Sequence, residues 1–577
     1  MIMELDNYVQ SQVEKWLAGN YSEETKAEIR TLQQENPQEL VEAFYRNLEF
    51  GTGGLRGIMG VGTNRMNIYT VGMATQGLAN YLKMEFKDTQ IKVAVAYDSR
   101  NNSPLFGKTV SEIFAANGFK VYLFESLRPT PELSFAIREL GCQSGVVVTA
   151  SHNPKIYNGY KAYWADGAQV IAPHDTNIIK EVEKITDVND VMWTGNSENI
   201  TMVGEDLDRI YLDKVLSLRL SPEAVAANND IKIVYTPIHG TGTVLVPRIL
   251  KECGFTAITC IEEQSIPDGN FPTVISPNPE EASALKMATD KAEEIGADLV
   301  MATDPDADRI GIAIRDNKGE LILLNGNQTG AILIYYLLTR HQELGKLTGK
   351  DFIVKTIVTS ELFIKIAEHF NVDHYNVLTG FKFIADIILK NEGVKNYIGG
   401  GEESYGFLAG DFVRDKDAIS ASMLIAECAA WAKTKGMTLY DLLIDIYAKF
   451  GFFKEGLVSV VKEGKSGQEE IKAIMTNYRE NPLTSLAGSK VVKIFDYKTS
   501  KGLDTVTGEA FDIDLPTSDV LQYLTEDGTI VSMRPSGTEP KIKFYFGVKV
   551  DMASKEEFEA ANATADEKIA KLKAELA

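Results

Sequence analysis

The sequence is poor in cysteine, and its few cysteines are not arranged to hold a metal or a disulfide framework. Its 577 residues include 4 cysteines, and no two of them form a CxxC pair. They stand at Cys142, Cys253, Cys260 and Cys428. Scattered cysteines of this kind are typical of free thiols in a reducing compartment. We therefore expect a cytoplasmic protein without structural disulfides.

Long apolar runs are also missing. Residues 331–338, AILIYYLL, are typical of the apolar stretches in this chain, whereas a membrane-spanning helix needs about 20 apolar residues. The first residues, MIMELDNYVQSQVEKW, contain acids and lack the apolar core of a secretory signal. The sequence therefore predicts neither a membrane span nor a secretory signal.

Positive charge is in short supply. The chain has 59 basic and 81 acidic residues, which gives a net charge of −22. A chain this acidic repels nucleic acids and anionic membranes, so we expect neither as a partner. If the ligand is an anion, its site must be a local basic exception.

Nucleotide-binding motifs are absent as well. The GKS at Gly464 lacks the upstream glycine of a P-loop, and no kinase glycine loop or HRD sequence is present. Residues 51–62, GTGGLRGIMGVG, fail the dinucleotide fingerprint because Arg56 stands where the third glycine belongs. This segment suits close approach of the backbone to an anion, and a plain turn is the alternative. We therefore do not expect ATP as a phosphoryl donor.

What the sequence does contain is a repeated α/β pattern. Its length suggests three to five domains, and its 44% hydrophobic and 24% charged residues are typical of a globular protein. Three copies begin near residues 90, 231 and 351. Each alternates apolar runs with helical stretches, which predicts βαβ units with parallel strands. Residues 1 to about 45 have the pattern of amphipathic helices that pack as an appendage, and the composition after Phe452 predicts a smaller α+β domain.

Each copy ends in a polar segment where its last strand stops. In the first copy, Val146 to Val148 predict a buried strand that stops at Thr149. Ser151 and His152 then lie at the carboxyl end of a strand, where open α/β sheets bind their ligands. No His/Asp triad is evident around Ser151. The three polar segments are TASHNP (149–154), DPDADR (304–309) and GEESYG (401–406).

The second of these segments has the composition of a cation site. Asp304, Asp306 and Asp308 alternate along it, and Pro305 excludes a helix interior. On an extended loop the three carboxylates face one way and suit a hard cation such as Mg²⁺, with room for a phosphate oxygen. An EF-hand is excluded because its sixth position is Arg309 in place of glycine. A solvated acidic turn is the alternative.

A second candidate anion site lies near the end of the chain. Residues 534–538, RPSGT, offer a bidentate guanidinium, two hydroxyls and a glycine that exposes backbone N–H groups. With Lys541 and Lys543 they predict a phosphate clamp. A basic turn between two strands is the alternative.

The third polar segment has sugar-binding composition. Glu402 and Ser404 follow three glycines, and we expect them on a loop too rich in glycine for core packing, where their oxygens suit sugar hydroxyls. Downstream, Asp417 is a plausible helix N-cap. A solvated charged face is the alternative for the nearby charges. Further candidate binding residues are Thr379, Gly380 and Lys382 on a turn upstream, and Lys416 in the charged cluster 414–417 that enters the helix.

Together these parts predict phosphoryl transfer. A metal neutralises charge, a serine can carry the phosphoryl group, and separate cationic sites grip a phosphate. Because no ATP motif is present, Ser151 itself becomes the candidate donor.

The segments TASHNP, DPDADR, GEESYG and RPSGTEP, in this order, resemble those of the α-D-phosphohexomutase family, and the phosphoglucomutase branch most closely. The likeness covers nearly the whole chain from about Phe50 onward. It implies an α/β protein of four domains around a central cleft. Three of them are similar mixed or parallel α/β domains, and the smaller C-terminal one is α+β. From the likeness and the pattern together we expect domains at 1–200, 201–320, 321–450 and 451–577.

The resemblance also implies the roles of single residues. Ser151 would be the phosphoserine, and with Asp304, Asp306 and Asp308 it would bind one Mg²⁺. Lys161 would be the general acid/base. The positions that match residues of the catalytic centre are His152 and Arg56, and those that match substrate-binding or cationic positions are Arg309, Thr379, Gly380, Lys382, Glu402, Ser404, Lys416, Arg534, Ser536, Gly537 and Thr538.

On this basis the expected reaction interconverts glucose 1-phosphate and glucose 6-phosphate through phospho-Ser151 and a bound glucose 1,6-bisphosphate, in a monomer or weak homo-oligomer. One branch of the family has a histidine after the sugar loop, whereas this chain has Tyr405 followed by Gly406. That difference points away from dual mannose/glucose specificity and leaves the acid/base open. The alternatives are a phosphomannomutase, a phosphopentomutase, a serine- and metal-dependent phosphatase, or a non-catalytic sugar-phosphate sensor.

Overall fold

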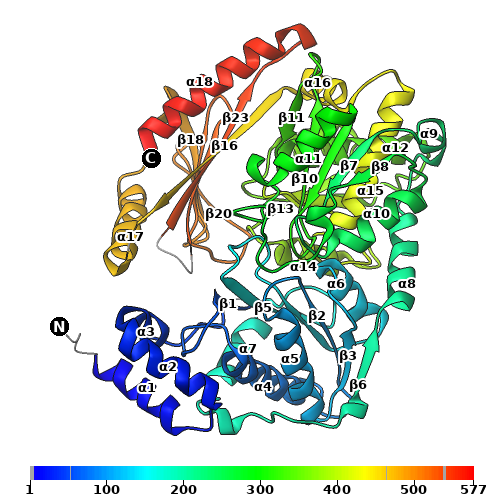
Figure 1. The fold of residues 1–577 in the computed structure, drawn as a ribbon. Coiled ribbons are helices and arrows are strands. Elements are labelled where there is room, and N and C mark those ends of the chain that lie inside the picture. The colour runs from blue at the N-terminus through cyan, green and yellow to red at the C-terminus, as the bar shows by residue number, and fades with distance from the viewer. Residues whose placement is uncertain (1–5, 52, 463, 537–540, 577) are drawn as a thin grey trace.

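The structure is a computed structural model that describes residues 6–51, 53–462, 464–536 and 541–576. Its strands form four sheets that follow one another along the chain. We call the parts built on these sheets the first unit (54–203), second unit (233–324), third unit (351–409) and fourth unit (452–550). The first unit lies at the bottom of Figure 1, beside the N-terminal helices, and the other three lie above it.

The chain begins with three helices, as the sequence predicts. Ser22 caps the second helix by accepting a hydrogen bond from the backbone N–H of Thr25, and Pro37 opens the third. Trp16 lies at the centre of their own small core, which packs against Tyr69 of the first unit. The three are α1 (Asn7–Ala18), α2 (Glu23–Glu35) and α3 (Pro37–Phe44).

The first unit has a six-stranded sheet in the order β1-β5-β4-β2-β3-β6. Strand β2 runs parallel to β3 and β4, whereas β5 is antiparallel to β4 and β1 is antiparallel to β5. Every residue of β4 is buried, which confirms the strand predicted from Val146 to Val148. The strands are β1 (Gly54–Ile58), β2 (Lys92–Tyr97), β3 (Lys120–Phe124), β4 (Ser144–Val148), β5 (Tyr157–Trp164) and β6 (Ile200–Val203). The helices are α4 (Ile68–Glu85), α5 (Ser103–Ala116), α6 (Thr130–Glu139), α7 (His174–Glu183) and the 3₁₀ turns Val188–Asp190 and Ser197–Asn199.

The second unit follows after two linking helices. Its sheet has the order β11-β10-β9-β7-β8, with β7 parallel to β8 and β9 and with β10 antiparallel to β9. The strands are β7 (Ile233–Thr236), β8 (Ile258–Cys260), β9 (Leu299–Thr303), β10 (Ile310–Arg315) and β11 (Leu321–Leu324). The helices are α8 (Glu205–Leu216), α9 (Pro222–Ala227), α10 (Gly242–Cys253), α11 (Ala282–Ile295) and the 3₁₀ turn Glu263–Ser265.

The third unit has a sheet in the order β13-β12-β14-β15. Strand β12 is parallel to β13 and β14, and β15 is antiparallel to β14. Its strands are β12 (Asp351–Thr356), β13 (Asp373–Val377), β14 (Asn396–Glu402) and β15 (Gly406–Ala409). The helices before, within and after it are α12 (Gly326–Glu343), α13 (Leu362–His369), α14 (Phe381–Asn391), α15 (Ala418–Thr434) and α16 (Leu439–Phe450).

The first three units share one topology, which confirms the repeat read from the sequence. In each, a middle strand lies between two parallel partners, and the third parallel strand turns back into an antiparallel neighbour. The three polar segments are the turns of these hairpins, between β4 and β5, β9 and β10, and β14 and β15. Equivalent strand ends therefore present equivalent loops.

The glycines of the third polar segment lie elsewhere than expected. Gly399, Gly400 and Gly401 belong to the buried strand β14, and Glu402 is its last residue. A Cβ atom on Gly400 would lie 2.1 Å from the carbonyl oxygen of Val354 on β12. The expectation of a glycine-rich loop was wrong because these glycines allow close approach between two strands.

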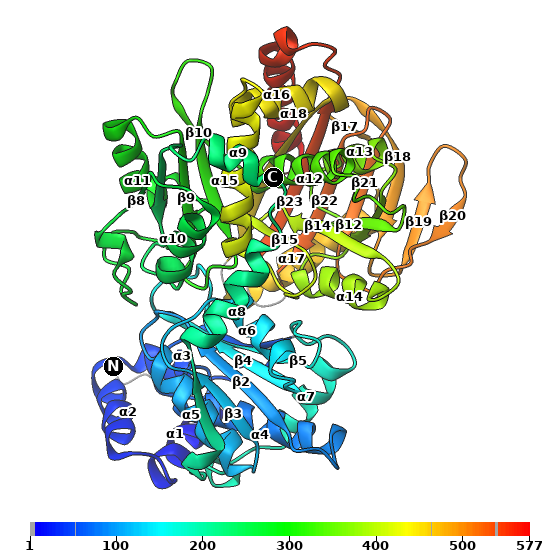
Figure 2. The same cartoon turned by 90° about the vertical axis from the view of Figure 1, so that its right-hand side faces the viewer.

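The fourth unit is rich in antiparallel strands, as predicted. Its sheet has the order β16-β23-β22-β21-β18-β19-β20, with β17 paired to β18. Figure 2 shows β19 and β20 projecting from the body of the molecule. The strands are β16 (Phe452–Val461), β17 (Ser485–Leu486), β18 (Ser489–Asp496), β19 (Lys501–Asp504), β20 (Ala510–Asp512), β21 (Leu521–Thr525), β22 (Ile530–Pro535) and β23 (Lys541–Val550). The helices are α17 (Gly464–Glu480), α18 (Phe558–Leu576) and the 3₁₀ turn Lys555–Glu557.

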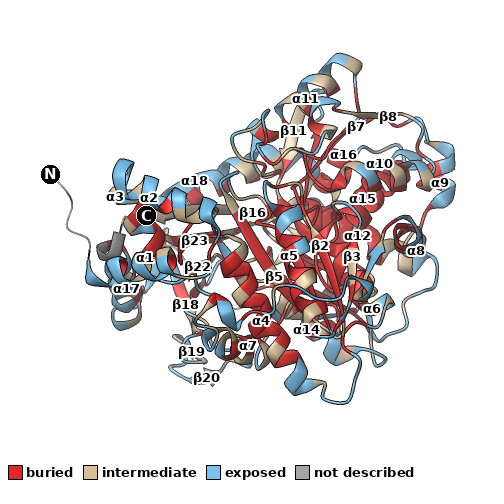
Figure 3. Cartoon of the chain, turned by 60° about the horizontal axis from the view of Figure 1, so that its bottom comes forward, coloured by how far each residue is buried: buried red, intermediate tan, exposed pale blue. Residues whose placement is uncertain are grey.

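The central parallel strands β2, β4, β7, β9 and β12 are almost entirely buried. Figure 3 shows buried strands covered by helices whose outer faces are exposed. One apolar cluster continues from the first unit into the other three, so the units share packing across their boundaries. None of the helices in the described part of the chain combines the length and the apolar character of a membrane span.

Candidate active site

Ser151 lies in the turn that follows β4, in a backbone conformation that is rare for serine. Its φ is 51° and its side chain is only 4% exposed. Its Oγ donates a hydrogen bond of 2.8 Å to Oδ2 of Asp304 and lies 3.2 Å from Nδ1 of His152. The serine that no local triad supported therefore has a partner from the second unit.

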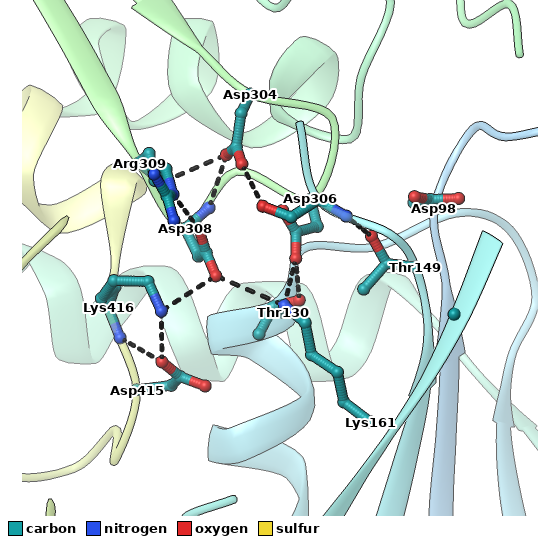
Figure 4. A network of polar contacts seen from close by, with 12 residues as sticks. Asp98, Thr130, Thr149, Lys161, Asp304, Asp306, Asp308, Arg309, Asp415 and Lys416 are labelled. Carbon is teal, nitrogen blue, oxygen red and sulfur yellow. Dashed lines mark hydrogen bonds and ion pairs between the residues drawn. The ribbon is translucent and has the colours of Figure 1, made fainter. Parts of the chain in front are cut away.

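The three aspartates of the second unit converge, as the sequence predicts. Asp304, Asp306 and Asp308 are buried, and each offers a carboxylate oxygen within 4.8 Å of the others. Oδ1 of Asp304 accepts hydrogen bonds from the backbone N–H groups of Asp308 and Arg309, at 3.2 and 3.1 Å. Figure 4 shows the carboxylates gathered at one point. Their burial excludes the alternative of a solvated acidic turn.

These carboxylates fit a metal ion. Oδ1 of Asp306 and Oδ1 of Asp308 are buried without a hydrogen-bond partner. Burial, and then the charges of Asp306 and Asp308, raise the pKa of Asp304 well above its ordinary value. Buried oxygens without partners next to like charges are unfavourable unless a cation neutralises them. A set of hard oxygen donors suits a divalent cation such as Mg²⁺.

Two lysines from other units hold the remaining oxygens of the same aspartates. Nζ of Lys161, on β5, lies 2.7 Å from Oδ2 of Asp306 and 3.5 Å from Oδ2 of Asp308. Nζ of Lys416, which follows β15, lies 3.1 Å from Oδ2 of Asp308. Burial lowers the pKa of Lys161, but the two aspartates outweigh it and raise that pKa above its ordinary value. Both lysines are therefore held as cations beside the aspartates.

Thr130 also supports the aspartates, although nothing in the sequence marked it. It lies at the start of α6, where its Oγ1 donates to Oδ2 of Asp306 at 2.9 Å and its backbone N–H donates to the carbonyl of Asp306 at the same distance. The beginning of a helix favours a carboxylate. The start of α6 meets the aspartate turn of the second unit, and this proximity cannot be recognised from the sequence alone.

Lys416 is fixed in turn by a carboxylate and a phenol. Asp415 accepts hydrogen bonds from the backbone N–H and from Nζ of Lys416, at 2.8 and 3.0 Å. The hydroxyl of Tyr163, on β5, donates to Oδ2 of Asp415 at 2.5 Å. A buried contact between the first and third units thus positions a lysine at the aspartates. Nothing in the sequence marked Tyr163.

Arg100 is a further residue that the sequence analysis missed. Its guanidinium donates to the carbonyl oxygens of Ser151 and Asn153 at 2.6 and 2.5 Å, and to those of Pro154 and Tyr157 at 3.0 Å. The only signal was its place three residues after the end of β2, since strand ends of this kind carry functional groups.

Arg56 and Arg309 approach the same region. Arg56 lies on β1, where its Nη1 donates to Oδ1 of Asn153 at 3.3 Å. Arg309 pairs with Glu280 at 2.7 Å. Burial, followed by these two arginines, lowers the pKa of His152 well below its ordinary value, so this imidazole is neutral near pH 7.

The third unit brings Glu402 and the turn before α14 together. Oε1 of Glu402 accepts a hydrogen bond of 2.9 Å from the backbone N–H of Gly380. Nζ of Lys382 lies 3.9 Å from Asp175 of the first unit. Thr379 and Ser404 are half-buried on the neighbouring turns. Asp417 caps α15 through the backbone N–H groups of Ile419 and Ser420, as the sequence predicts.

The predicted phosphate clamp lies on the fourth unit. Arg534 is half-buried on β22, opposite Lys543 on β23, and Ser536 follows the strand. Burial and then Glu402 raise the pKa of Glu403 to about 7, against the opposing effect of Lys543 and Arg534. The clamp arginine is therefore close to the turn of the third unit. Gly537 and Thr538 lie outside the described residues.

Comparison with known protein families gives the same four parts. Models described as "Phosphoglucomutase/phosphomannomutase, alpha/beta/alpha domain" I, II and III match residues 47–189, 209–319 and 325–450. The model for the C-terminal domain matches residues 459–565. The chain belongs to the phosphoglucomutase/phosphomannomutase family. The resemblance drawn from the four segments is thereby confirmed.

Members of this family with similar sequences include two staphylococcal proteins. The chain is 37% identical over 548 residues to a phosphoglucomutase of Staphylococcus haemolyticus, covering 95% of this chain and 96% of that protein. It is 38% identical over 517 residues to a phosphoglucomutase of Staphylococcus aureus, covering 90% and 92%.

Solved structures of the family share the fold. A protein described as a phosphomannomutase from Thermus thermophilus aligns with a TM-score of 0.66 at 22% identity, covering 91% of this chain and 99% of that one. A phosphoglucomutase from Paramecium, in an open form, aligns with a TM-score of 0.67 at 19% identity, covering 91% and 94%. At this identity the likeness speaks for the fold alone.

Proposed function

We propose that this chain interconverts glucose 1-phosphate and glucose 6-phosphate, with Ser151 as the carrier of the phosphoryl group. The observation that carries the proposal is the hydrogen bond of 2.8 Å from Oγ of Ser151 to Asp304, inside a cluster of three buried aspartates. Full-length relatives that are named phosphoglucomutases support glucose as the sugar.

The proposed reaction moves one phosphoryl group out and another back. In the first half, the P–O bond to Oγ of phospho-Ser151 breaks, and a P–O bond to the free hydroxyl of the hexose phosphate forms. The hydroxyl loses its proton to the enzyme, and the product is glucose 1,6-bisphosphate. The bisphosphate then reorients within the site. In the second half, its other phosphoryl group is transferred back to Ser151. Splitting the exchange into two displacements at one serine is nucleophilic catalysis.

We assign the metal site to Asp304, Asp306, Asp308 and Ser151, and the ion to Mg²⁺. When bound, Mg²⁺ would neutralise negative charge at the phosphoryl group. The chain's own residues do the remaining work. Lys161 and Lys416 hold the aspartates from two sides. We assign the exchange of the hydroxyl proton to Lys161, which can act as the base only after it has released its own proton to solvent.

We assign the far end of the substrate to the third and fourth units. Glu402 and Ser404 would accept and donate hydrogen bonds to sugar hydroxyls. The cationic positions Arg309, Lys382 and Lys416 would attract the anionic ligand to a chain of net charge −22. The distal phosphate would be held by Arg534, Ser536, Gly537 and Thr538, and the positions that complete the site are Arg56, His152, Thr379 and Gly380.

The first test is the variant Ser151→Ala. We expect conversion of glucose 1-phosphate, in the presence of Mg²⁺ and a trace of glucose 1,6-bisphosphate, to fall by at least about 10⁴-fold, because no other group would carry the phosphoryl. A matched control is Ser111→Ala, which removes a buried hydroxyl of α5 that bonds only its own helix at Gly107. The proposal fails if Ser151→Ala turns over normally while its circular dichroism matches wild type.

A kinetic comparison separates the alternatives. Glucose, mannose and pentose phosphates would be assayed side by side, each with its own bisphosphate. We expect the highest kcat/KM for glucose 1-phosphate. Release of inorganic phosphate without isomerisation would favour a phosphatase, and tight binding without turnover would favour a sensor.

We also infer a cytoplasmic monomer or weak homo-oligomer that binds neither nucleic acids nor membranes. The four free cysteines, three of them buried, support the reducing compartment. Sedimentation at micromolar concentration would test the assembly state.

A further inference from the structure

Arg100 fastens the turn that carries Ser151. Its guanidinium is 1% exposed and donates to four backbone carbonyls, those of Ser151, Asn153, Pro154 and Tyr157. Hydrogen bonds from a charged donor are stronger than neutral ones, and arginine presents its donors in a rigid fork. One side chain therefore holds both arms of the turn between β4 and β5.

These hydrogen bonds hold the backbone of Ser151 in a strained conformation. A φ of 51° places Ser151 in the left-handed region, which L-residues other than glycine, asparagine and aspartate rarely adopt. Such conformations are unfavourable and persist where surrounding contacts enforce them. In this conformation Oγ of Ser151 reaches Oδ2 of Asp304.

Arg100 is itself held within the first unit by a buried carboxylate. Oδ2 of Asp98 lies 3.3 Å from its Nε, and Oδ1 of Asp98 accepts from the backbone N–H of Arg100 and from the hydroxyl of Ser103. This pair fixes the start of the side chain but leaves the face of the guanidinium uncovered.

The second unit covers that face. The ring of Phe271 lies 5.2 Å from the Cζ atom of Arg100, is 2% exposed and belongs to a residue whose φ is 46°. Next to it, Oδ1 of Asn270 accepts a hydrogen bond of 3.0 Å from the side chain of Asn101. A Cβ atom on Gly269 would lie 2.2 Å from the backbone nitrogen of Asn101, so the two backbones touch.

The segment that carries Phe271 also reaches the aspartate turn. His239 anchors it at the carbonyl of Ile266 and the hydroxyl of Thr273, at 2.8 and 2.9 Å. Farther along, Glu280 pairs with Arg309, whose backbone N–H bonds Asp304. Residues 266–280 therefore contact both Arg100, which holds the turn of Ser151, and Arg309, which adjoins the aspartates.

We propose that Arg100 and Phe271 are positioning residues for phosphoryl transfer at Ser151. Arg100 enforces the left-handed conformation of the serine through the four carbonyls, and Phe271 keeps the guanidinium seated by a buried cation–π contact from the neighbouring unit. The alignment of the phosphoryl carrier thereby depends on the second unit. The expected change in kcat rests on the proposed function, whereas the expected change in hydrogen exchange does not.

The test compares Phe271→Leu with Phe271→Tyr, and with Ile275→Ala as a control in the same segment, where Ile275 is 97% exposed. For Phe271→Leu we expect kcat about tenfold lower with KM within about twofold, because a misplaced serine weakens chemistry more than binding. Phosphorylation of Ser151 by glucose 1,6-bisphosphate should slow to the same extent. Phe271→Tyr keeps the ring and should restore both rates.

Hydrogen exchange supplies a readout that does not need the reaction. Residues 149–157 should exchange about tenfold faster in Phe271→Leu than in Phe271→Tyr or Ile275→Ala. Unchanged exchange and unchanged kcat in Phe271→Leu would overturn the proposal, as would a rise in KM alone. Faster exchange in a protein without mutase activity would retain the positioning role and reject the proposed function.

Arg100→Lys gives the stronger second variant. A single ammonium cannot donate to four carbonyls in a fixed plane, so we expect a larger loss of kcat than in Phe271→Leu. Wild-type kcat in a folded Arg100→Lys enzyme would overturn the role of Arg100. If this variant does not fold, the Phe271 series still decides the question.

Discussion

At the residue scale, the aspartate cluster combines buried negative charge with incomplete hydrogen bonding. Asp306 and Asp308 each place Oδ2 beside a lysine, and Oδ1 of each is buried without a hydrogen-bond partner. Burial raises the pKa of Asp306, but Lys161 outweighs it and lowers that pKa below its ordinary value, so this carboxylate stays ionised. The lysines therefore keep the carboxylates ionised and leave the Oδ1 atoms available to bind a cation.

This arrangement predicts the effect of Asp308→Asn. Replacing the carboxylate removes one ligand charge, while Lys416 remains in place as a cation bonded to Asp415. We therefore expect affinity for a divalent cation to fall by at least about tenfold. Electron paramagnetic resonance of added Mn²⁺ measures this directly, without the reaction.

The control for that experiment is Asp290→Asn, which removes an exposed carboxylate paired with Lys286 on α11. Its Mn²⁺ affinity should equal that of wild type. Equal affinities in Asp308→Asn and Asp290→Asn would argue against a cation at the aspartates.

At the scale of elements, the hairpin at the end of each parallel strand explains why distant residues meet. Strands β4, β9 and β14 are the third parallel strands of their sheets, and each turns back into an antiparallel neighbour. Because parallel strands end on the same edge of a sheet, each repeat delivers its polar turn from the same position. The turns that carry Ser151, the three aspartates and Glu402 therefore occupy equivalent positions in their three sheets.

The packing of β14 gives a prediction for Gly400→Ala. The added methyl group would lie 2.1 Å from the carbonyl oxygen of Val354 and 2.9 Å from the hydroxyl of Tyr397. Since β12 and β14 must separate to admit it, we expect a loss of about 1–3 kcal/mol in the free energy of unfolding, seen as a lower melting temperature. Glu402, at the end of β14, would shift with the strand and lower activity.

Gly547→Ala is the matched control within a strand. Gly547 lies in the middle of β23, and a Cβ atom there would find its nearest neighbour at 3.8 Å. Its melting temperature should stay within about 1–2 °C of wild type. If Gly400→Ala is as stable as Gly547→Ala, the close approach of β12 and β14 is not tight.

At the scale of the whole molecule, the contact between the third and fourth units contains titratable groups. The amide of Gln522, on β21, donates to the carbonyl of Ile357 at 3.0 Å. Burial raises the pKa of Glu455, on β16, to about 7, while the hydroxyl of Ser360 and the charge of Lys355 act in the opposite direction. Lys355 is itself buried and pairs with Glu361 at 2.7 Å.

The raised pKa of Glu455 predicts how stability depends on pH. Between the ordinary value of 4.5 and about 7, the folded protein binds more protons at this group than the unfolded chain does. The free energy of unfolding therefore falls as pH rises through this window, and the loss is complete above about 7. Calorimetry between pH 5.5 and 8 should show wild type losing melting temperature relative to Glu455→Gln.

A suitable control is Glu480→Gln, an exposed glutamate of the same unit. The difference in melting temperature between this variant and wild type should stay constant across the same pH range. A constant difference for Glu455→Gln as well would show that Glu455 is not protonated in the folded protein near neutral pH.

The sequence by itself determined the elements and the positions of the main polar turns. Alternating apolar runs predicted the three repeated units, Asp417 marked a helix start, and the spacing of Asp304, Asp306 and Asp308 predicted their convergence. These features depend on neighbours within a few residues, where backbone geometry leaves few choices. The same local reasoning failed at Gly399–Gly401, because glycine composition is the same in a loop and in a strand that packs closely.

Only the tertiary structure decided which turns meet and what holds them. Ser151 contacts Asp304 from 153 positions away, and Thr130 contacts Asp306 from 176 positions away. Phe271 covers Arg100 from another unit. Such contacts depend on how separately folded sheets pack together, which no local pattern encodes. For that reason the chemistry was predictable from its turns, whereas the residues that position it were not.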